Sequence, residues 1–507
     1  AREEKIQKQE TVTDEALKQL KKKYAILKAD KASNTFVLHC KKWLSQQTEE
    51  EIEKSQTYTV VNDKTKEEII EDDYQFVSKE KMATKIKESD PDIKTPPEHR
   101  IFRETIPTMG VSVKCHKKNQ LRVMARSHKT SLSSVAMWIG KALNAMMPVS
   151  EQIWKDIFAT VGINAHGSWV IKNSTQVRKR MDQMNAAQAT PHQKCQQTYD
   201  FSTMYTQLKL EELKKVMKKY VNMVFAYANK AVGKKGEKVL RVKARGALRS
   251  PWYLKKATPG DKDNVKIVTP ERMMEWIEYL LDNLYIQVGD KIVRQTCGIP
   301  MGTSCSPFLA NLMLFVYELE AVTDIISKTD ILHEERRRTI WKLAQCTRYI
   351  DDLWNPLISK RAFMEITKRM YPKWLALGEP EHEGNAVNYL DMTIWWDGAE
   401  KKWQSKLYDK KRRTRAQRAQ DKQVPASGVN PVGNLQIWCH NKPTAPLQCG
   451  MHEKSRFHPS SKKAACVIHP QGIRRRKSQQ VLQQVPATTC SWTARQDKSV
   501  PKAHRGA

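Results

Sequence analysis

Two adjacent acidic residues, Asp351 and Asp352, lie inside a stretch that is otherwise mostly aromatic and aliphatic, TRYIDDLW from Thr347 to Trp354. A pair of neighbouring aspartates is ordinarily a surface turn, but the apolar residues on both sides favour a tight hairpin within a packed sheet. Adjacent carboxylates repel each other there unless a cation balances them. A divalent metal meets that need, because Mg²⁺ binds through one or two carboxylates together with substrate phosphates. The stretch therefore predicts a hairpin that carries a metal-binding pair.

A further acidic residue of interest lies far upstream. Asp200 follows a strand-like stretch in TYDFSTMYTQL, residues 198–208, and Tyr205 comes five residues later. An aspartate at the end of a strand is ordinarily a turn or helix-capping residue. Alone, this stretch leaves a structural and a catalytic role open.

Between these two stretches, QTCGIPMGTSCSPFLANL at residues 295–312 predicts a turn followed by a helix. Its glycines and first proline break the chain, and Ser306 with Pro307 begins a long apolar helix, since proline suits the first helical turn. A glycine-bearing turn ahead of a helix lets a base pair and a ribose approach the backbone closely. A strand–turn–helix unit without any function is the alternative that this stretch leaves open by itself.

The order of the three stretches favours a polymerase palm. Two separated carboxylates that converge on a metal pair suit in-line attack of a 3′-hydroxyl on a nucleotide phosphate. The stretches resemble motifs A, B and C of a reverse transcriptase, and in detail those of the Penelope-like retroelement branch, which is related to telomerase. RQTCGIPMGTSCSPFLANLMLFVYELE, residues 294–320, resembles motif B of that branch almost throughout. NYLDMTIWW and SKLYDKK, within residues 388–411, resemble the strands that follow its catalytic hairpin.

The resemblance extends toward the N-terminus. KADKASNTFV at residues 28–37 resembles a short Asp-Lys block ahead of the polymerase domain in these elements. KCHKKNQLR, from Lys114 to Arg122, resembles the fingers motif P-K-x-H-K…R, with Val113 in place of the usual proline. Altogether the resemblance covers about residues 15–411, roughly four-fifths of the chain.

The resemblance implies an α+β chain with a right-hand polymerase fold, made of fingers and a palm with an antiparallel sheet. The implied division is an N-terminal charged helical region with the Asp-Lys block at 1–98, fingers at 99–195, a palm with a basic insertion (229–256) at 196–400, a post-palm strand and primer-grip region at 401–411, and a basic, disordered or decayed thumb region at 412–507. Apolar spacing predicts helices at 16–27, 133–147, 211–228 and 271–284, and strands at 35–39, 57–61 and 119–125.

The resemblance also implies roles for single residues at the catalytic centre. Asp200 and Asp351 would be the metal ligands, Asp352 would support the site as a further ligand, and the backbone carbonyl of Phe201 would add another. Tyr205 would stack under the incoming sugar and exclude a 2′-hydroxyl. A core tyrosine on a helix is the alternative for Tyr205.

Residues around the nucleotide follow from the same resemblance. Lys114 and Arg122 would grip the triphosphate, because cations offset phosphate charge. Gly302 and Ser306 would line the pocket for template and nucleotide. Lys406, in the SKLYDKK stretch, would lie near the primer grip.

The charge of the chain favours an anionic partner. The 507 residues include 88 lysines and arginines against 55 acidic residues, a net charge of +33. Nucleic acid is the first expectation for such a charge and an anionic membrane the second. Residues 229–256 have a net charge of +9 and interspersed glycines, which we interpret as a basic, loop-rich insertion. We expect phosphate-backbone contacts there from Lys234, Lys235, Lys238, Arg241, Lys243 and Arg245.

The C-terminal part has a different texture. Residues 401–507 carry a net charge of +19, and Pro, Gln, Ser and Arg dominate after about residue 411. We expect a poorly ordered basic tail without a working thumb, and hence short, distributive products. Cys449 with His452, and Cys466 with His469, resemble zinc-ligand spacing. We do not expect zinc in the tail, because its other Cys and His residues make chance matches easy.

Several classes of protein are excluded on sequence. No run of about 18 apolar residues is present, so no membrane span or membrane partner is expected. The first residues lack the apolar core of a secretory signal. The ten cysteines include no C-x-x-C pair, which fits a reducing compartment. We expect an intracellular, nuclear rather than cytoplasmic, location. No P-loop, H-E-x-x-H, G-x-S-x-G or GIY-YIG endonuclease pattern is found.

These observations predict an RNA-directed DNA polymerase. Its partners would be an RNA template, a DNA or RNA primer and deoxynucleoside triphosphates, and its cofactor Mg²⁺, with Mn²⁺ as a replacement in vitro. The main alternative is a decayed or domesticated polymerase that only binds nucleic acid: the intact carboxylates argue against it, and the altered C-terminus argues for decay. A group II intron maturase or retron-type enzyme is a third interpretation, which the YIDD and QTCGIPMG context disfavours.

Overall fold

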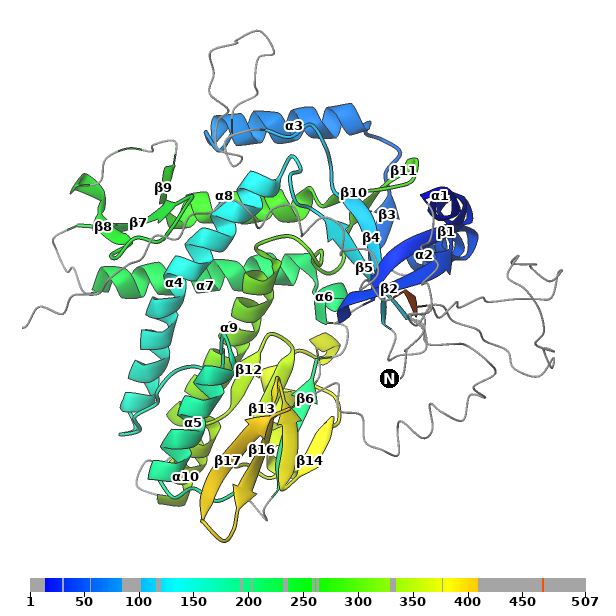
Figure 1. The fold of residues 1–507 in the computed structure, drawn as a ribbon. Coiled ribbons are helices and arrows are strands. Elements are labelled where there is room, and N and C mark those ends of the chain that lie inside the picture. Colours follow the sequence, from blue (N-terminus) through cyan, green and yellow to red (C-terminus); the bar gives the residue numbers. More distant parts are fainter. Residues whose placement is uncertain are drawn as a thin grey trace, which may run out of the picture. The chain divides into compact units, whose positions relative to one another are not determined.

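The computed structural model of the 507-residue chain describes residues 14–29, 32–54, 56–83, 102–114, 120–191, 195–201, 204–230, 236–257, 260, 264–328, 334–375, 377–408 and 467–468 (Figure 1). The chain divides into two compact units, one of residues 1–43 with 427–507 and one of residues 44–426.

The smaller unit contains a β-hairpin preceded by a helix. Helix α1 (Asp14–Lys23) leads into β1 (Tyr24–Ala29), which pairs antiparallel with β2 (Ala32–Cys40). The short β18 (Val467–Ile468) pairs with the other edge of β2. The helix predicted at 16–27 is wrong in its last turn, because pairing with β2 outweighs the helical spacing of the residues from Tyr24 onward. The strand predicted at 35–39 is confirmed within β2.

The larger unit has a helical core in which α4, α7, α8 and α9 pack on one another. Their apolar faces bury large side chains, among them Trp154, Tyr220, Trp276 and Phe315. The predicted helices at 133–147, 211–228 and 271–284 are confirmed in α4, α7 and α8. The helices after β2 are α2 (Lys41–Lys54), α3 (Lys66–Lys79), α4 (Ser133–Ala159), α5 (Ser174–Ala186), α6 (Met204–Gln207), α7 (Leu210–Lys230), α8 (Pro270–Asp282), α9 (Ser306–Ser327), α10 (Glu334–Leu343) and α11 (Lys360–Met370).

Local sequence sets where these helices begin. The side chain of Thr269 accepts a hydrogen bond from the backbone N–H of Arg272, at 3.3 Å, and Pro270 occupies the first turn of α8. Helix α9 begins at Ser306 with Pro307 in its first turn, as the sequence predicts.

A four-stranded antiparallel sheet carries the predicted carboxylates. Its strands, in spatial order, are β12 (Thr347–Tyr349), β13 (Asp352–Asn355), β6 (Gln196–Asp200) and β14 (His382–Gly384). A second antiparallel sheet, of β15 (Ala386–Tyr389), β16 (Met392–Asp397) and β17 (Lys402–Leu407), lies beside it, with β15 in contact with β6 and β14 (Figure 1).

A third sheet of the larger unit combines strands that precede α4 in sequence with two strands that lie between α8 and α9. Strand β4 (Thr108–Lys114) pairs antiparallel with β5 (Gln120–Arg126) and parallel with β10 (Tyr285–Val288). Strand β11 (Lys291–Gln295) joins β10 to β3 (Tyr58–Val60). The strands predicted at 57–61 and 119–125 are confirmed in β3 and β5. The chain is thus of mixed α+β class with several sheets.

The insertion at 229–256 is more regular than predicted. In place of a loop-rich segment, β7 (Lys238–Lys243) pairs antiparallel with β8 (Trp252–Leu254) on one side and β9 (Val265–Val268) on the other. Val239, Leu240 and Val242 are buried, and β7 packs against α4 and α7. The many charges in this segment led to the prediction of a loop, although these apolar residues are buried and stabilise the small sheet.

Candidate active site

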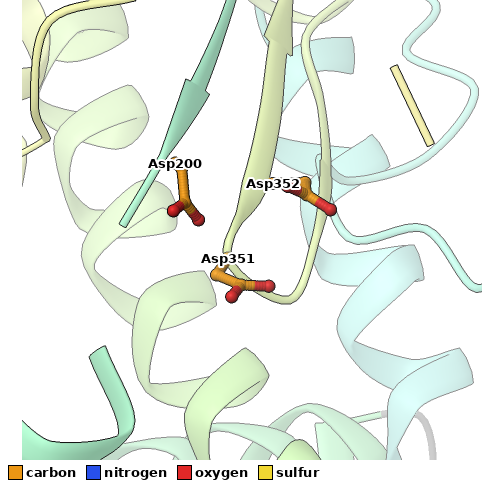
Figure 2. A group of neighbouring side chains, drawn as sticks. All are labelled: Asp200, Asp351 and Asp352. Atoms are coloured by element: carbon orange, nitrogen blue, oxygen red, sulfur yellow. The ribbon is translucent and has the colours of Figure 1, made fainter. Parts of the chain in front are cut away.

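Three aspartates converge at one end of the sheet β12–β13–β6–β14. Asp200 is the last residue of β6, Asp351 lies in the turn between β12 and β13, and Asp352 is the first residue of β13. One carboxylate oxygen of each lies within 4.8 Å of those of the other two, and all three residues are half-buried (Figure 2). The three residues that the sequence singled out are therefore brought together from segments about 150 positions apart.

The pairing register explains this convergence. Asp352 lies directly opposite Asp200 in the antiparallel pair of β13 and β6, so both side chains lie on one face of the sheet. The backbone N–H of Phe201 donates to the carbonyl of Asp351 at 3.2 Å, which ties the turn to the end of β6. The hairpin predicted from TRYIDDLW is confirmed, with Tyr349 paired to Asp352 across a two-residue turn.

Tyr389, at the end of β15, supports the hairpin from the neighbouring sheet. Its hydroxyl lies within donor distance of the carbonyls of Thr347, at 3.2 Å, and Asp352, at 3.3 Å. Its ring stacks on Trp354 with centroids 6.0 Å apart. Burial raises the pKa of Tyr389 above its ordinary value, so the hydroxyl remains a donor. Tyr389 was not among the predicted site residues, although it lies in the NYLDM stretch that resembles the family.

The donor set fits a hard divalent cation. Three carboxylates within this distance repel one another unless a positive charge lies among them. Carboxylate oxygens are the ligands that Mg²⁺ prefers, and partial exposure leaves room for water and substrate oxygens. The residues that could hold such an ion are Asp200, Asp351 and Asp352.

Tyr205 lies close to this group. It belongs to the short helix α6 and is half-buried. Burial raises the pKa of Tyr205 to about 12, and the negative charge of Asp351 contributes to the shift. Its backbone carbonyl accepts a hydrogen bond from Ile299 at 2.8 Å. A Cβ on Gly298, whose φ is +78°, would lie 2.3 Å from that carbonyl oxygen, so the turn can approach α6 only with glycine there.

The same turn also holds β5. Gly302 has a φ of +123°, and a Cβ on it would lie 2.2 Å from the carbonyl oxygen of Ala125. The backbone N–H of Ala125 donates to the carbonyl of Met301 at 2.9 Å. The turn at 298–302 thus joins α6, which carries Tyr205, to β5, which carries Arg122.

Two predicted cations lie on one face of the β4–β5 pair. Arg122 lies opposite Ser112, and Lys114 lies opposite Gln120, so Arg122 and Lys114 are diagonal neighbours. Arg126, which was not predicted as a site residue, lies on the same face.

Arg126 lies over a glycine of the partner strand. A Cβ on Gly110 would lie 2.7 Å from Nε of Arg126, so the missing side chain leaves room for the guanidinium. The alternation along β5 is the signal that could have identified Arg126. This face therefore carries three basic residues.

Two predicted residues are buried. The hydroxyl of Ser306, which is 2% exposed, donates to the carbonyl of Pro300 at 2.9 Å. The hydroxyl of Ser306 therefore holds the turn, and the lining of the template–nucleotide pocket by Ser306 stays a prediction. Phe201 is also 2% exposed, and its ring contacts Tyr371 edge-on with centroids 4.9 Å apart.

The predicted nucleic-acid-binding residues lie away from the carboxylates in sequence. The guanidinium of Arg241 lies 4.8 Å from the ring centroid of Tyr253, and Nζ of Lys406 lies 5.7 Å from that of Trp395. Lys243, Arg245 and Lys406 are exposed. Lys238, Arg241 and Lys243 belong to β7, Arg245 follows it, and Lys406 belongs to β17.

Several predicted residues lie outside the described part of the chain. They are Lys234, Lys235, His116 and Lys117, and the tail residues Cys449, His452, Cys466 and His469.

The architecture and the site define a mixed α+β protein with a three-carboxylate centre at the end of an antiparallel sheet. The chain is similar to solved telomerase from Candida albicans in complex with a TWJ fragment of telomeric RNA, at 10% identity and a TM-score of 0.44, over 75% of this chain and 54% of that one. It is also similar to telomerase from Candida tropicalis in complex with a TWJ fragment, at 10% identity and a TM-score of 0.45, over 80% of this chain and 54% of that one.

This chain spans about half the length of these telomerase chains. No protein-family model and no curated protein matches it. We therefore base the function on the geometry of the site. Among the helices of the described residues, none has the length and apolar character that crossing a bilayer requires.

Proposed function

We propose that this chain is an RNA-directed DNA polymerase of the Penelope-like, telomerase-related type. It would extend a DNA or RNA primer with deoxynucleotides on an RNA template, as a retroelement enzyme does. The observation that carries the proposal is the convergence of Asp200, Asp351 and Asp352 within 4.8 Å, from a strand end and a hairpin turn. Paired metals on such carboxylates are a general solution for in-line displacement at phosphate.

The carboxylates define where the reaction would take place. Bound Mg²⁺, or Mn²⁺ in vitro, would supply the positive charge that activates the primer hydroxyl and offsets charge on the phosphate. Asp200 and Asp351 would hold the ions from opposite sides of the β6–β13 junction, with Asp352 as a further ligand. The bond from Phe201 N–H to the Asp351 carbonyl keeps the turn against β6 while substrate enters.

Nucleotide binding would use the residues around the turn at 298–302. The turn binds the backbone carbonyl of Tyr205 and joins α6 to β5. Tyr205 would contact the sugar of the incoming nucleotide. Lys114 and Arg122, with Arg126 on the same face, would bind the triphosphate, since a planar guanidinium matches phosphate oxygens.

Template and primer would be held by charge. Lys243 at the end of β7, Arg245 in the loop after it and Lys406 in β17 are exposed, and they would contact a phosphate backbone without reading bases. The net charge of +33 also fits the alternative, a decayed or domesticated polymerase that only binds nucleic acid. The two functions differ in whether the carboxylates are needed.

Primer extension separates the two functions. The purified chain should extend an oligo(dT) primer on a poly(rA) template with deoxythymidine triphosphate and Mg²⁺. Asp200→Asn should abolish extension because it removes a ligand charge, while RNA affinity stays within a few-fold. Binding of the template–primer without any extension by the wild-type chain would support the binding-only alternative.

A further inference from the structure

The turn that carries Asp351 has an unusual backbone. Ile350, the first of its two residues, has a φ of +58°. Positive φ is a true outlier for a β-branched residue. The hairpin of β10 and β11 has the same two-residue length, but glycine occupies the equivalent position, Gly289, at a φ of +59°. Backbone of this kind persists only where the surroundings hold it, so the contacts of Ile350 are informative.

A buried arginine binds the backbone of this turn at Ile350. Nη1 of Arg348, whose side chain is 0% exposed, donates to the carbonyl of Ile350 at 2.8 Å. Nη1 also donates to Oδ1 of Asn311 at 2.8 Å, and Nη2 to the carbonyl of Asn311 at 3.0 Å. The guanidinium thus connects the turn to α9, a helix about 40 residues away in sequence.

A buried carboxylate fixes the guanidinium in turn. Nε of Arg348 donates to Oε1 of Glu318 at 2.5 Å, and Nη2 to Oε2 at 3.2 Å. The Glu318 side chain is also 0% exposed, and the hydroxyl of Tyr371 donates to its Oε1 at 2.9 Å. The ring of Tyr371 contacts Phe201, the residue after Asp200. The network therefore reaches the neighbours of both Asp351 and Asp200.

A buried ion pair is an expensive way to stabilise a core. Removing two charges from water costs free energy that the pair only partly recovers, and apolar residues often serve stability as well. Five guanidinium N–H groups in a rigid plane, however, can bind a carboxylate and two carbonyls at once. An arginine can therefore hold the backbone carbonyl of Ile350 in place while Glu318 fixes its guanidinium.

We propose that Arg348, held by Glu318 and Tyr371, is a positioning residue that sets the backbone of Ile350 and thereby holds the carboxylate of Asp351 near that of Asp200. The proposal rests on the proposed function, in which Asp351 is a metal ligand. It assigns to α9 a second role, that of anchoring the catalytic turn, in addition to its part in the helical core.

The test uses a double variant of the full chain. Arg348→Met with Glu318→Leu removes both charges together, which leaves no unpaired charge in the core. We expect the variant to fold, with a melting temperature close to that of the wild type. We expect Mn²⁺ binding, measured by electron paramagnetic resonance without nucleic acid, to weaken by about 10-fold or more, and kcat for primer extension to fall about 10- to 100-fold, as for residues that orient metal ligands elsewhere.

A second pair in the same unit provides the control. Nε of Arg272 lies 2.7 Å from Oε2 of Glu80, and Trp276 also donates to that oxygen. Arg272→Met with Glu80→Leu should leave Mn²⁺ affinity and kcat unchanged. Wild-type Mn²⁺ affinity and kcat in the folded Arg348→Met, Glu318→Leu variant would overturn the proposal.

Two further variants separate the possible failures. If Asp351→Asn leaves Mn²⁺ binding unchanged, the proposed metal site is wrong, whatever the role of Arg348. If the double variant does not fold, Tyr371→Phe decides, since it removes one hydroxyl and keeps the ring on Phe201. A several-fold loss of kcat with unchanged KM in Tyr371→Phe supports positioning, and wild-type kcat in that folded variant overturns it.

Discussion

Tyr205 is the residue that we propose excludes a 2′-hydroxyl by the bulk of its ring. It is half-buried beside the carboxylates, and the charge of Asp351 contributes to its raised pKa, about 12. At neutral pH the ring is therefore a neutral steric group. Substitution of Tyr205 distinguishes a ring that contacts substrate from one that only fills the core.

Tyr205→Ala should admit ribonucleotides, because the proposed discrimination comes from the ring and not from its hydroxyl. We expect the ratio of deoxyribonucleotide to ribonucleotide incorporation to fall about 10-fold or more, a change that steric selection can supply. Tyr205→Phe is the matched control and should keep the wild-type ratio. An unchanged incorporation ratio in Tyr205→Ala would mean that Tyr205 has only a structural role in the core.

A buried acid in α3 makes stability depend on pH. Asp73 is 2% exposed and accepts hydrogen bonds from Ser131 at 2.5 Å and Tyr279 at 3.2 Å. Burial raises its pKa to about 7, although these bonds oppose the shift. The protonated form is thus favoured in the fold, and its contribution to stability is lost as pH rises from about 4 to 7.

Asp73→Asn should remove this dependence, because the amide is neutral throughout. Relative to the wild type, the variant should gain on the order of 2 kcal/mol of unfolding free energy between pH 5 and pH 8. Thermal unfolding of both proteins across that range measures the difference. If the difference in unfolding free energy between the two proteins is the same at every pH, Asp73 does not titrate in the folded protein over this range.

Among the elements of the site, the turn at 298–302 connects different parts of the chain. It contacts α6 through Gly298 and β5 through Gly302, and α9 begins directly after it. Small changes in this turn should therefore move several predicted functional residues together.

Gly302→Ala should be severe, because the new Cβ would lie 2.2 Å from a backbone carbonyl and the φ of +123° is strained for alanine. We expect a loss of more than about 2 kcal/mol in stability and a clear drop in kcat. Gly246→Ala is the matched control, since Gly246 also has positive φ, +71°, but no atom within 4 Å of its Cβ position. Equal effects of the two substitutions would mean that strain alone, and not contact with β5, matters at Gly302.

The basic loop after β7 should bind phosphates without reading sequence. Because β7 itself is packed in the fold, substitutions test this better than deletion of the segment. Lys243→Gln with Arg245→Gln should reduce the slope of log affinity against log salt by about 1 to 2, equally for different RNA sequences. An unchanged slope would place these two cations in bulk solvent.

The sequence predicted those elements whose signals are local. The hairpin with Asp351, the strand ending at Asp200 and the start of α9 all follow from residue types within a few positions. The contact between Arg348 and Glu318 joins residues 30 positions apart, and no pattern in the sequence predicts that these two residues pair. Likewise, β1 and β7 are strands because they pair with β2 and with β8 and β9, and the helical spacing of β1 and the charges of β7 do not show this pairing, so both predictions were wrong.

The whole molecule is organised around its three-carboxylate centre, on which the proposed roles of the other residues depend. The larger unit uses a helical core and adjoining sheets to hold three carboxylates together at a strand junction. The hydrogen-bond network around Arg348 and the turn at 298–302 contribute to catalysis only if those carboxylates catalyse nucleotide addition.

The most direct measurement is the rate of primer extension by wild type, Asp351→Asn and Asp290→Asn on one RNA template. Asp290 is the second residue of the turn between β10 and β11, as Asp351 is between β12 and β13, and it is exposed. We predict a loss of about 100-fold or more for Asp351→Asn, since it removes charge where transition-state stabilisation would be centred, and a near wild-type rate for Asp290→Asn. A near wild-type rate for Asp351→Asn, or an equal loss in both variants, would contradict the account.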